Sequence, residues 1–332
     1  MNYPPQEILR LNGGNGASFF FSTASQEDWQ RSLEFYRAVS RQAAGKKILL
    51  KLAYPILKFH TNLSSAETAE LITCELKLSV PSQIPEHGSA MISPTRDKAV
   101  IHRHGEGYEK VATGKSFEGV VRELEVYRLL NRQPSTAFAF STLGDSELKP
   151  GEVRFFMKYA KGCFSERIPS PESLIVPLVE FCRLTETRNS WEKQWASLGN
   201  ELAEMVPEAE RTGSTPVGLV HRDFKPWNVK HGVKPLFFDF ESADFAGCPL
   251  EDLFNYTVDP LLRLQSPERV WETVQKQAPL QNALLEMLGL PQNMRMRYWR
   301  WYLLERTAFW RKQGQRKFAE CFLILYEISS KK

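Results

Sequence analysis

The chain has few cysteines and no long uninterrupted apolar run. Its five cysteines are scattered and none forms a C-x-x-C pair, so a disulfide framework and a zinc site are both disfavoured. The longest apolar segments, Lys47–Lys58 and Phe318–Ile328, carry charges and are too short to span a bilayer. The first residues lack the basic and then apolar pattern of a signal peptide. We therefore expect a soluble protein of the cytoplasm.

The sequence also lacks internal repeats and low-complexity segments. Its 332 residues are 42% hydrophobic and 25% charged, a balance that excludes a collagen-like or wholly disordered chain. The net charge of +4 hides fourteen acidic against eight basic residues in 180–260, and thirteen basic against six acidic in 261–332. Such a division can mark a cation site beside an anion-facing surface, although ordinary solvated helices explain the same counts.

Hydrophobic patterning predicts a β-rich first part and a mainly helical second part, which is the α+β class. A glycine-rich hairpin turn is expected at Gly13–Gly16, a break at Pro55, and a linker at Val80–Pro94. The predicted strands are Ile8–Leu11, Ser18–Ser22, Leu71–Leu78, Ala99–His102, Tyr108–Ala112, Val153–Tyr159, Gly218–His221 and Leu236–Phe240. Helices are predicted at Ser25–Val39 and Phe117–Leu130, and for most of the chain after Glu172.

One stretch carries a recognisable chemistry. His221, Asp223 and Asn228 have the spacing H-x-D-x-x-x-x-N, and Asp239 follows at the end of an apolar strand. Asn228 and Asp239 offer the oxygen ligands that Mg²⁺ prefers, while Asp223 can accept a proton from a substrate hydroxyl. This division of labour is what phosphoryl transfer needs. The alternative is a turn in which the Asp and Asn side chains only cap backbone groups.

The sequence HRDFKPWN followed by DFE resembles the Brenner motif of the aminoglycoside phosphotransferase/choline kinase family, within the protein-kinase-like superfamily. The resemblance covers the chain from about residue 90 onward. It implies a two-lobed fold that holds ATP and Mg²⁺ between a β-rich N-lobe and a helical C-lobe. We expect residues 1–90 to form an extension on or within the N-lobe, 91–160 the nucleotide-binding lobe, and 161–332 the catalytic and acceptor-binding lobe.

The resemblance also implies an N-lobe lysine paired with a glutamate. Lys110 lies in the middle of a predicted strand, where the lysine that binds the nucleotide phosphates belongs. In the helix that follows, Glu123 borders the apolar face whereas Glu125 points away, so Glu123 is the expected partner. The alternative is that Lys110 and Glu123 are ordinary surface charges.

Two further nucleotide contacts are implied. The strand that contains Met157 and ends at Tyr159 resembles the hinge whose backbone would contact adenine. No G-x-G-x-x-G precedes Lys110, so the expected phosphate loop is Ile92–Lys98, with hydroxyls from Ser93 and Thr95.

The motif departs from the family pattern at two points. H-G-D is replaced by H-R-D with Arg222, and Lys225 follows the expected base, where it could stabilise the γ-phosphate. The D-F-G of protein kinases is replaced by D-F-E and no A-P-E follows, which argues against a protein kinase. Glu241 could bind a metal or bond backbone amides. Asp252 is expected to brace the catalytic loop, and His221 to organise it from a buried position.

Two segments, Lys46–Lys58 and Arg295–Lys312, are basic and amphipathic. Core packing with snorkelling basic side chains is the commoner outcome, and peripheral contact with the inner face of a membrane is the alternative. The acidic catalytic region argues against a nucleic-acid partner.

The acceptor is the least determined part of the function. The D-F-x-P-W-N loop, Ser32–Tyr36 and Gly45–Lys51 resemble phosphotransferases of bacterial surface-polysaccharide synthesis. This favours a small-molecule or glycan hydroxyl. The alternatives are an aminoglycoside-type antibiotic kinase and a nucleotide-binding regulatory pseudokinase, the last disfavoured because every expected catalytic residue is present.

Overall fold

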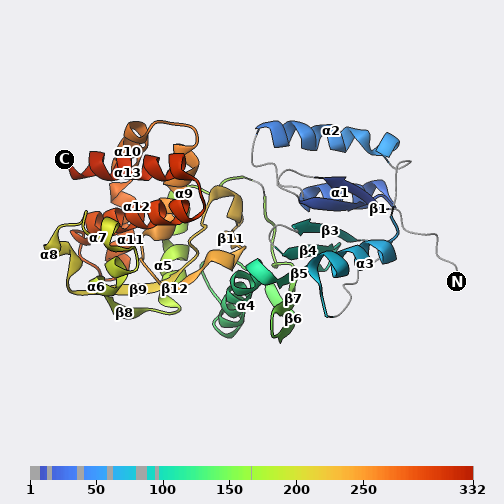
Figure 1. Cartoon of the computed structure of the whole chain (residues 1–332), viewed down its shortest axis with the longest axis horizontal. Coiled ribbons are helices and arrows are strands. Elements are labelled where there is room, and N and C mark those ends of the chain that lie inside the picture. Colours follow the sequence, from blue (N-terminus) through green and yellow to red (C-terminus); the bar gives the residue numbers. More distant parts are fainter. Residues whose placement is uncertain are drawn as a thin grey trace. The chain divides into compact units, whose positions relative to one another are not determined.

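The computed structural model describes residues 8–12, 17–35, 41–57, 63–79, 88–93, 97–165 and 167–331. The chain divides into two compact units (Figure 1). The first consists of Met1–Asn131 and Ser141–Lys161, and the second of Arg132–Phe140 and Gly162–Lys332. The first is built on a large sheet and the second is mainly helical, so the α+β class predicted from the sequence is confirmed.

A seven-stranded antiparallel sheet forms the first unit. Its strand order is β1-β2-β3-β4-β5-β7-β6. Five of the predicted strands are confirmed as β1, β2, β4, β5 and β7, while the predicted turn Gly13–Gly16 lies outside the described residues. The strands are β1 (Ile8–Asn12), β2 (Ser18–Ser22), β3 (Gly88–Ser93), β4 (Lys98–Arg103), β5 (Gly107–Thr113), β6 (Thr142–Lys149) and β7 (Glu152–Lys158).

Helices cover both faces of this sheet. Because side chains alternate along a strand, Phe20 and Phe21 of β2 point to opposite faces. Phe21 packs with Trp29 of α1 (Gln26–Phe35), and α2 (Arg41–Leu57) adds partly buried side chains to the same cluster. Phe20 packs with Ile72 of α3 (Ser65–Leu76). The sheet therefore has an apolar core on each side.

The helix α3 corrects one prediction. Leu71–Leu78 was expected to be a strand, but the chain there is helical up to Leu76. The helix begins with a capping box, in which Glu67 N donates to Ser64 Oγ at 3.2 Å and Ser64 N donates to Glu67 Oε2 at 2.7 Å. These reciprocal bonds satisfy two backbone N–H groups at the start of the helix, and the local β-branched residues do not override them.

Two other predictions for this unit were wrong in part, and one strand was missed. Pro55 does not break its segment, because α2 continues to Leu57. The predicted linker Val80–Pro94 contains β3, which pairs with β2 and β4. The strand β6 was not predicted, since its exposed and charged residues hide the alternation expected of a strand.

The helix α4 (Phe117–Arg132) brings the predicted glutamate to the sheet. It buries Val120, Leu124 and Tyr127, as its periodicity predicts, and the Tyr127 and Phe155 rings lie 6.1 Å apart. This packing fixes the rotation of α4 about its axis, and it buries Glu123 completely while Glu125 stays exposed.

The second unit combines many helices with short strands. The strands β12, β9 and β8 form one small sheet, and β10 and β11 form a hairpin. The predicted strand Gly218–His221 is the end of β9, whereas the second predicted strand is shorter than expected. The elements are α5 (Ile175–Arg183), β8 (Thr187–Ser190), α6 (Trp191–Ala196), α7 (Asn200–Ala203), α8 (Glu208–Arg211), β9 (Ser214–Val220), β10 (Val229–Lys230), β11 (Leu236–Phe237), β12 (Asp244–Gly247), α9 (Glu251–Leu262), α10 (Pro267–Lys276), α11 (Ala278–Met287), α12 (Met294–Lys312) and α13 (Arg316–Ser330).

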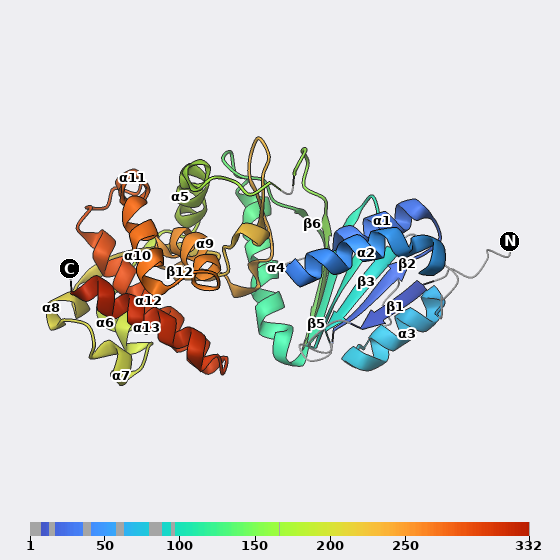
Figure 2. The same cartoon turned by 90° about the horizontal axis from the view of Figure 1, so that it is seen from above.

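The basic, aromatic segment near residue 300 forms core. In α12, Trp299 lies 5.0 Å from Phe254 of α9 and 5.5 Å from Trp271 of α10, measured between ring centroids. The helix also lies beside α13 (Figure 2). Core packing, the commoner outcome expected for this segment, is therefore confirmed for α12. Within the described ranges, no helix is both long and apolar enough to cross a membrane.

Gly218 generates a first prediction, because β9 leads directly into the H-R-D loop. A Cβ at this position would lie 2.2 Å from the Cys182 carbonyl oxygen of α5. Gly218→Ala is expected to lower the free energy of unfolding by about 1–3 kcal/mol, since backbone must move to make room. Denaturant unfolding measures it, with Ser214→Ala at the exposed start of β9 as control. Equal stability of the Gly218 variant and the wild type would contradict the close approach.

Candidate active site

The H-R-D loop is held by a buried carboxylate at the start of α9. Asp252 accepts hydrogen bonds from the backbone N–H groups of His221 at 2.7 Å and Arg222 at 2.9 Å. Arg222 has a left-handed backbone (φ 62°), an unfavourable conformation for a residue with a Cβ. The two bonds to one carboxylate hold this turn in place. The bracing role expected for Asp252 is confirmed.

Burial raises the pKa of Asp252 to about 6, while the nearby His221 and its backbone N–H oppose the shift. A folded-state pKa above the value of an unfolded chain means that protonation favours the folded state. This contribution to stability is complete at low pH and is lost as the pH rises from about 4 to about 6. At neutral pH the carboxylate therefore depends on its N–H donors to offset its burial.

His221 connects the loop to the segment between β11 and Asp239. It is completely buried, and its Nε2 lies 2.9 Å from the carbonyl oxygen of Phe238. Because a carbonyl only accepts, Nε2 carries the proton in this bond. The ring also packs against Phe224 and Phe240. His221 is the buried organiser that the sequence predicts.

Asp223, the predicted base, is oriented by two residues of its own loop. Asn228 Nδ2 donates to the Asp223 carbonyl at 2.8 Å and to its Oδ2 at 2.9 Å. Lys225 Nζ lies 2.6 Å from the other carboxylate oxygen, Oδ1. The Asp223 side chain nevertheless keeps 36% of its surface exposed, so its carboxylate is accessible from solvent.

The sequence did not predict the second partner of Lys225. Its Nζ also lies 2.7 Å from Oδ2 of Asp259, a carboxylate that is only 3% exposed, and the ammonium sits between two acids. The indole rings of Trp227 and Trp310 lie 5.7 and 5.8 Å from it. Asp259 follows Asp252 by seven residues, so the two share one face of α9, and this spacing was the available signal.

Arg222, which departs from the family pattern, forms ion pairs with three carboxylates of the second unit. Its Nε lies 3.0 Å from Glu251 Oε1, and its other nitrogens contact Asp244 and Glu305. Burial disfavours its charge, but Glu251 and Asp244 outweigh that effect and raise the pKa of Arg222. The Arg222 carbonyl accepts a hydrogen bond from Asn255 at 2.9 Å. This arginine ties the loop to β12, α9 and α12.

A polar cavity of about 310 Å³ lies beside this arginine within the second unit. Its volume is at the lower end of the range for small-molecule sites. The lining combines carboxylates, basic groups and aromatic rings, among them Arg222, Asp244, Glu305, Trp301, Phe309 and Lys312.

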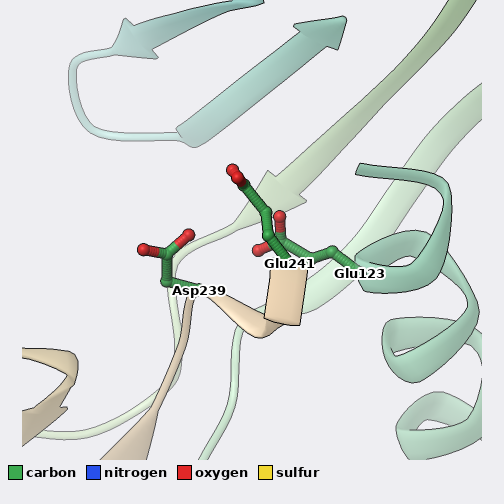
Figure 3. A group of neighbouring side chains, drawn as sticks. All are labelled: Glu123, Asp239 and Glu241. Carbon is green, nitrogen blue, oxygen red and sulfur yellow. The ribbon is translucent and has the colours of Figure 1, made fainter. Parts of the chain in front are cut away.

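Asp239 and Glu241 come from one short segment of the second unit. β11 ends at Phe237, and Asp239 follows with a left-handed backbone (φ 70°) before a 3₁₀ helix, Phe240–Ser242. Phe240 between them is completely buried, and the two acids project from the segment (Figure 3). A carboxylate oxygen of Asp239 lies within 4.8 Å of one from Glu241, a separation that one cation can bridge. Figure 3 also shows Glu123 on α4 of the first unit.

Lys110 and Glu123 form the predicted ion pair within the first unit. Lys110 Nζ lies 2.5 Å from Glu123 Oε2, and the side chains are 9% and 1% exposed. Removing one partner of so buried a pair leaves the other charge uncompensated, which is costly. The alternative of two ordinary surface charges is excluded.

The other predicted nucleotide contacts are described only in part. Thr95 and the side chain of Ser93 lie outside the described residues. Met157 is buried in β7, which pairs with both β5 and β6. The Tyr159 N–H donates to the Glu106 carbonyl at 3.1 Å, and its hydroxyl bonds His102.

Comparisons with known proteins give similar folds at low identity. No protein family model and no curated protein matches the sequence. A thermostable mutant of aminoglycoside phosphotransferase APH(4)-Ia is 15% identical, with 74% of this chain and 91% of that one covered and a TM-score of 0.43. The GDP and kanamycin complex of APH(2")-IIia is 11% identical, with 70% and 89% covered and a TM-score of 0.45.

A third similar structure is WbdD in complex with the kinase inhibitor LY294002. It is 16% identical, with 64% of this chain and 47% of that one covered and a TM-score of 0.32. The neighbours include the aminoglycoside phosphotransferases that the motif resemblance names.

The bracing of the loop generates a second prediction. In Asp252→Asn the amide keeps one acceptor but turns an NH₂ group towards the second backbone N–H. We expect the free energy of unfolding to fall by about 2–4 kcal/mol at neutral pH, because a buried donor loses its partner. Denaturant unfolding measures the loss, and Glu272→Gln at an exposed position of α10 is the control. The bracing role would be disproved by wild-type stability in the Asp252 variant.

Proposed function

We propose that this protein is a Mg²⁺-dependent phosphotransferase that moves the γ-phosphate of ATP to an alcohol group of a small molecule or sugar. The observation that carries the proposal is the bonding of Asp223. Asn228 and Lys225 hold an accessible carboxylate in a loop that Asp252 braces. A base whose position is fixed in advance lowers the entropic cost of reaching the transition state.

Asp223 would perform the proton transfer. Its carboxylate would accept the proton of the acceptor hydroxyl while that oxygen attacks the γ-phosphorus. The bond from the γ-phosphorus to the bridging oxygen breaks, and ADP leaves with the electron pair. Phosphoryl transfer of this kind depends mainly on positioning and on charge stabilisation. The many contacts that fix the loop fit this requirement.

Lys225 would stabilise charge on the transferring phosphate. In the structure its ammonium is shared by Asp223 and Asp259. When Asp223 turns to the substrate hydroxyl, the buried Asp259 would still hold the lysine. Asp259 is thus a positioning residue in this proposal, and Lys225 a catalytic one.

Asn228 and Asp239 would hold Mg²⁺, which neutralises phosphate charge when bound. The bonds from Asn228 Nδ2 to Asp223 fix the orientation of the amide, and its Oδ1 is the atom that a cation would take. Glu241 would add a further oxygen, which the short separation between its carboxylate and that of Asp239 supports. Hard oxygen donors suit this metal.

Lys110, held by Glu123, would bind the α- and β-phosphates of the nucleotide. Ser93 and Thr95 would add hydroxyls, and the backbone near Met157 and Tyr159 would contact adenine. The buried ion pair supports the first of these roles, because Glu123 restricts the lysine to one position on β5.

For the acceptor we favour a sugar hydroxyl, because the D-F-x-P-W-N loop resembles that of phosphotransferases of bacterial surface-polysaccharide synthesis. A peptide acceptor is disfavoured by the length of the segment after the D-F-E motif. Cys248-Pro249-Leu250 and then α9 follow Glu241 almost at once, which leaves no room for the peptide platform of protein kinases.

The test is a panel of sugars, amino alcohols and aminoglycosides incubated with Mg²⁺ and ATP, with mass spectrometry to detect a phosphate added to the acceptor. Transfer to aminoglycosides alone would replace the sugar proposal with an antibiotic kinase. Folded protein that neither binds nor hydrolyses ATP at millimolar concentration would overturn the phosphotransferase itself.

Asp223→Asn tests the base. We expect the rate of transfer, or of ATP hydrolysis, to fall about 10³-fold, because the variant loses the proton acceptor. Nucleotide affinity should be unchanged, because the buried Asp259 still holds Lys225. Turnover is measured by ADP release and affinity by calorimetry. Glu204→Gln, an exposed acid of the same unit, should retain full activity. Full turnover in Asp223→Asn would remove this residue as the base.

Glu123→Gln tests the nucleotide lysine. The variant removes the charge that holds Lys110, and we expect the KM for ATP to rise about tenfold or more. Glu125→Gln is a matched control, since it makes the same change two residues away on the exposed side of α4. Steady-state kinetics and a melting curve are recorded for both. If the two variants have the same KM at equal folded fraction, Glu123 has no part in nucleotide binding.

A further inference from the structure

The helix α2 has apolar side chains on two opposite faces. On the inner face, Leu50, Tyr54 and Leu57 pack against the buried cluster around Trp29. These residues are four and three positions apart, which places them on one side of a helix with 3.6 residues per turn. This face explains why the helix associates with the first unit.

Specific contacts fix the rotation of α2 about its own axis. Trp29 Nε1 donates to the Leu50 carbonyl at 3.1 Å, and the Trp29 and Tyr54 ring centroids are 6.0 Å apart. The Tyr54 hydroxyl donates to the Thr23 carbonyl at 3.4 Å. The helix therefore cannot turn its outer side chains inward without losing these contacts.

The outer face is apolar as well. Ile48, Leu52 and Ile56 follow at four-residue steps, opposite Leu50 and Tyr54, and they are 60%, 74% and 66% exposed. Leu49 extends the same stripe and is 67% exposed. Elsewhere in the described part of the chain, large apolar side chains are exposed one to an element. A single exposed residue is ordinary, but a contiguous stripe of four marks an interaction surface.

The charge of the helix indicates what this stripe contacts. Its sequence contains Arg41, Lys46, Lys47 and Lys51 and no acidic residue. Lys46 and Lys51 are exposed beside the stripe. An apolar stripe with basic residues along its sides is the pattern of helices that lie in the interface of an anionic membrane. The lysine stems would lie along the acyl boundary while their ammonium groups reach the headgroups.

We propose that the outer face of α2 docks on the surface of a membrane that contains anionic phospholipids. The helix would lie in the plane of the surface, with Ile48, Leu49, Leu52 and Ile56 inserted and the lysines at headgroup level. A second copy of this chain is a poorer occupant, because it would bring two sets of lysines together. The other basic segment, α12, offers no such surface, since none of its large apolar side chains is exposed.

The test is flotation of the full chain with vesicles. Wild-type protein is expected to float with vesicles of phosphatidylcholine and phosphatidylglycerol, to stay behind with pure phosphatidylcholine, and to be released by salt. Ile48→Gln combined with Leu52→Gln should weaken binding at least about tenfold, because two inserted side chains are lost. Lys46→Glu combined with Lys51→Glu should weaken it about fivefold or more for each lysine. Leu148→Gln, another exposed apolar position of the first unit, is the matched control and should bind like wild type.

Circular dichroism establishes that each variant is folded, which the exposure of the changed side chains leads us to expect. Absence of wild-type binding to the anionic vesicles, or equal binding by the glutamine double variant, would overturn the proposal. Equal binding to neutral and anionic vesicles would also overturn it, since the lysines would then have no role. Wild-type dimers that the double variant cannot form, without vesicle binding, would assign the stripe to a second copy of the chain instead.

Discussion

The candidate catalytic loop depends on one carboxylate that has to be satisfied. Asp252 is buried, and a buried charge without donors would destabilise the fold by several kcal/mol. The backbone N–H groups of His221 and Arg222 supply those donors, and they can do so only if Arg222 adopts its left-handed conformation. That turn in the chain determines the position of the Asp223 backbone. The buried Asp252 must be hydrogen-bonded, and the turn that provides its donors also sets the direction of the partly exposed Asp223 side chain.

The charged residues of the second unit fall into two groups with different tasks. The acids around Arg222 have a structural role, because Glu251 of α9 and Asp244 of β12 neutralise its partly buried guanidinium. Around Lys225 the arrangement is asymmetric, because one acid is buried and the other is partly exposed. Separating a buried acid from its lysine costs several kcal/mol of free energy, whereas an exposed acid can exchange its lysine for solvent or substrate at little cost. This difference separates a fixed partner, Asp259, from a reactive one, Asp223.

Much of this could be predicted from the sequence, where the determining information is local. Helical periodicity decided between Glu123 and Glu125, and the H-x-D-x-x-x-x-N spacing identified the loop and its supporting histidine. Asp259 was missed because its partner lies 34 residues earlier, and only the fold brings α9 to the loop. The strand predicted at Leu71–Leu78 was wrong, because the prediction did not take into account the S-x-x-E capping box that starts the helix before it. β3 was hidden in a segment rich in proline and serine, and it becomes a strand through pairing with β2 and β4.

The segment Lys46–Lys58 shows the limit of an argument from pattern. The sequence analysis treated core packing and membrane contact as alternatives. One helix can do both, because one face can pack in the core while the opposite face contacts a membrane. In α2 one apolar side is anchored on Trp29 and the opposite side is exposed, while α12, with a similar composition, is enclosed by its neighbours. Composition and periodicity describe what a helix can bury, but its neighbours decide how many of its sides are covered. Because the covered side of α2 is fixed by specific hydrogen bonds, its exposed apolar side is a property of the folded state and persists whether or not a membrane is present.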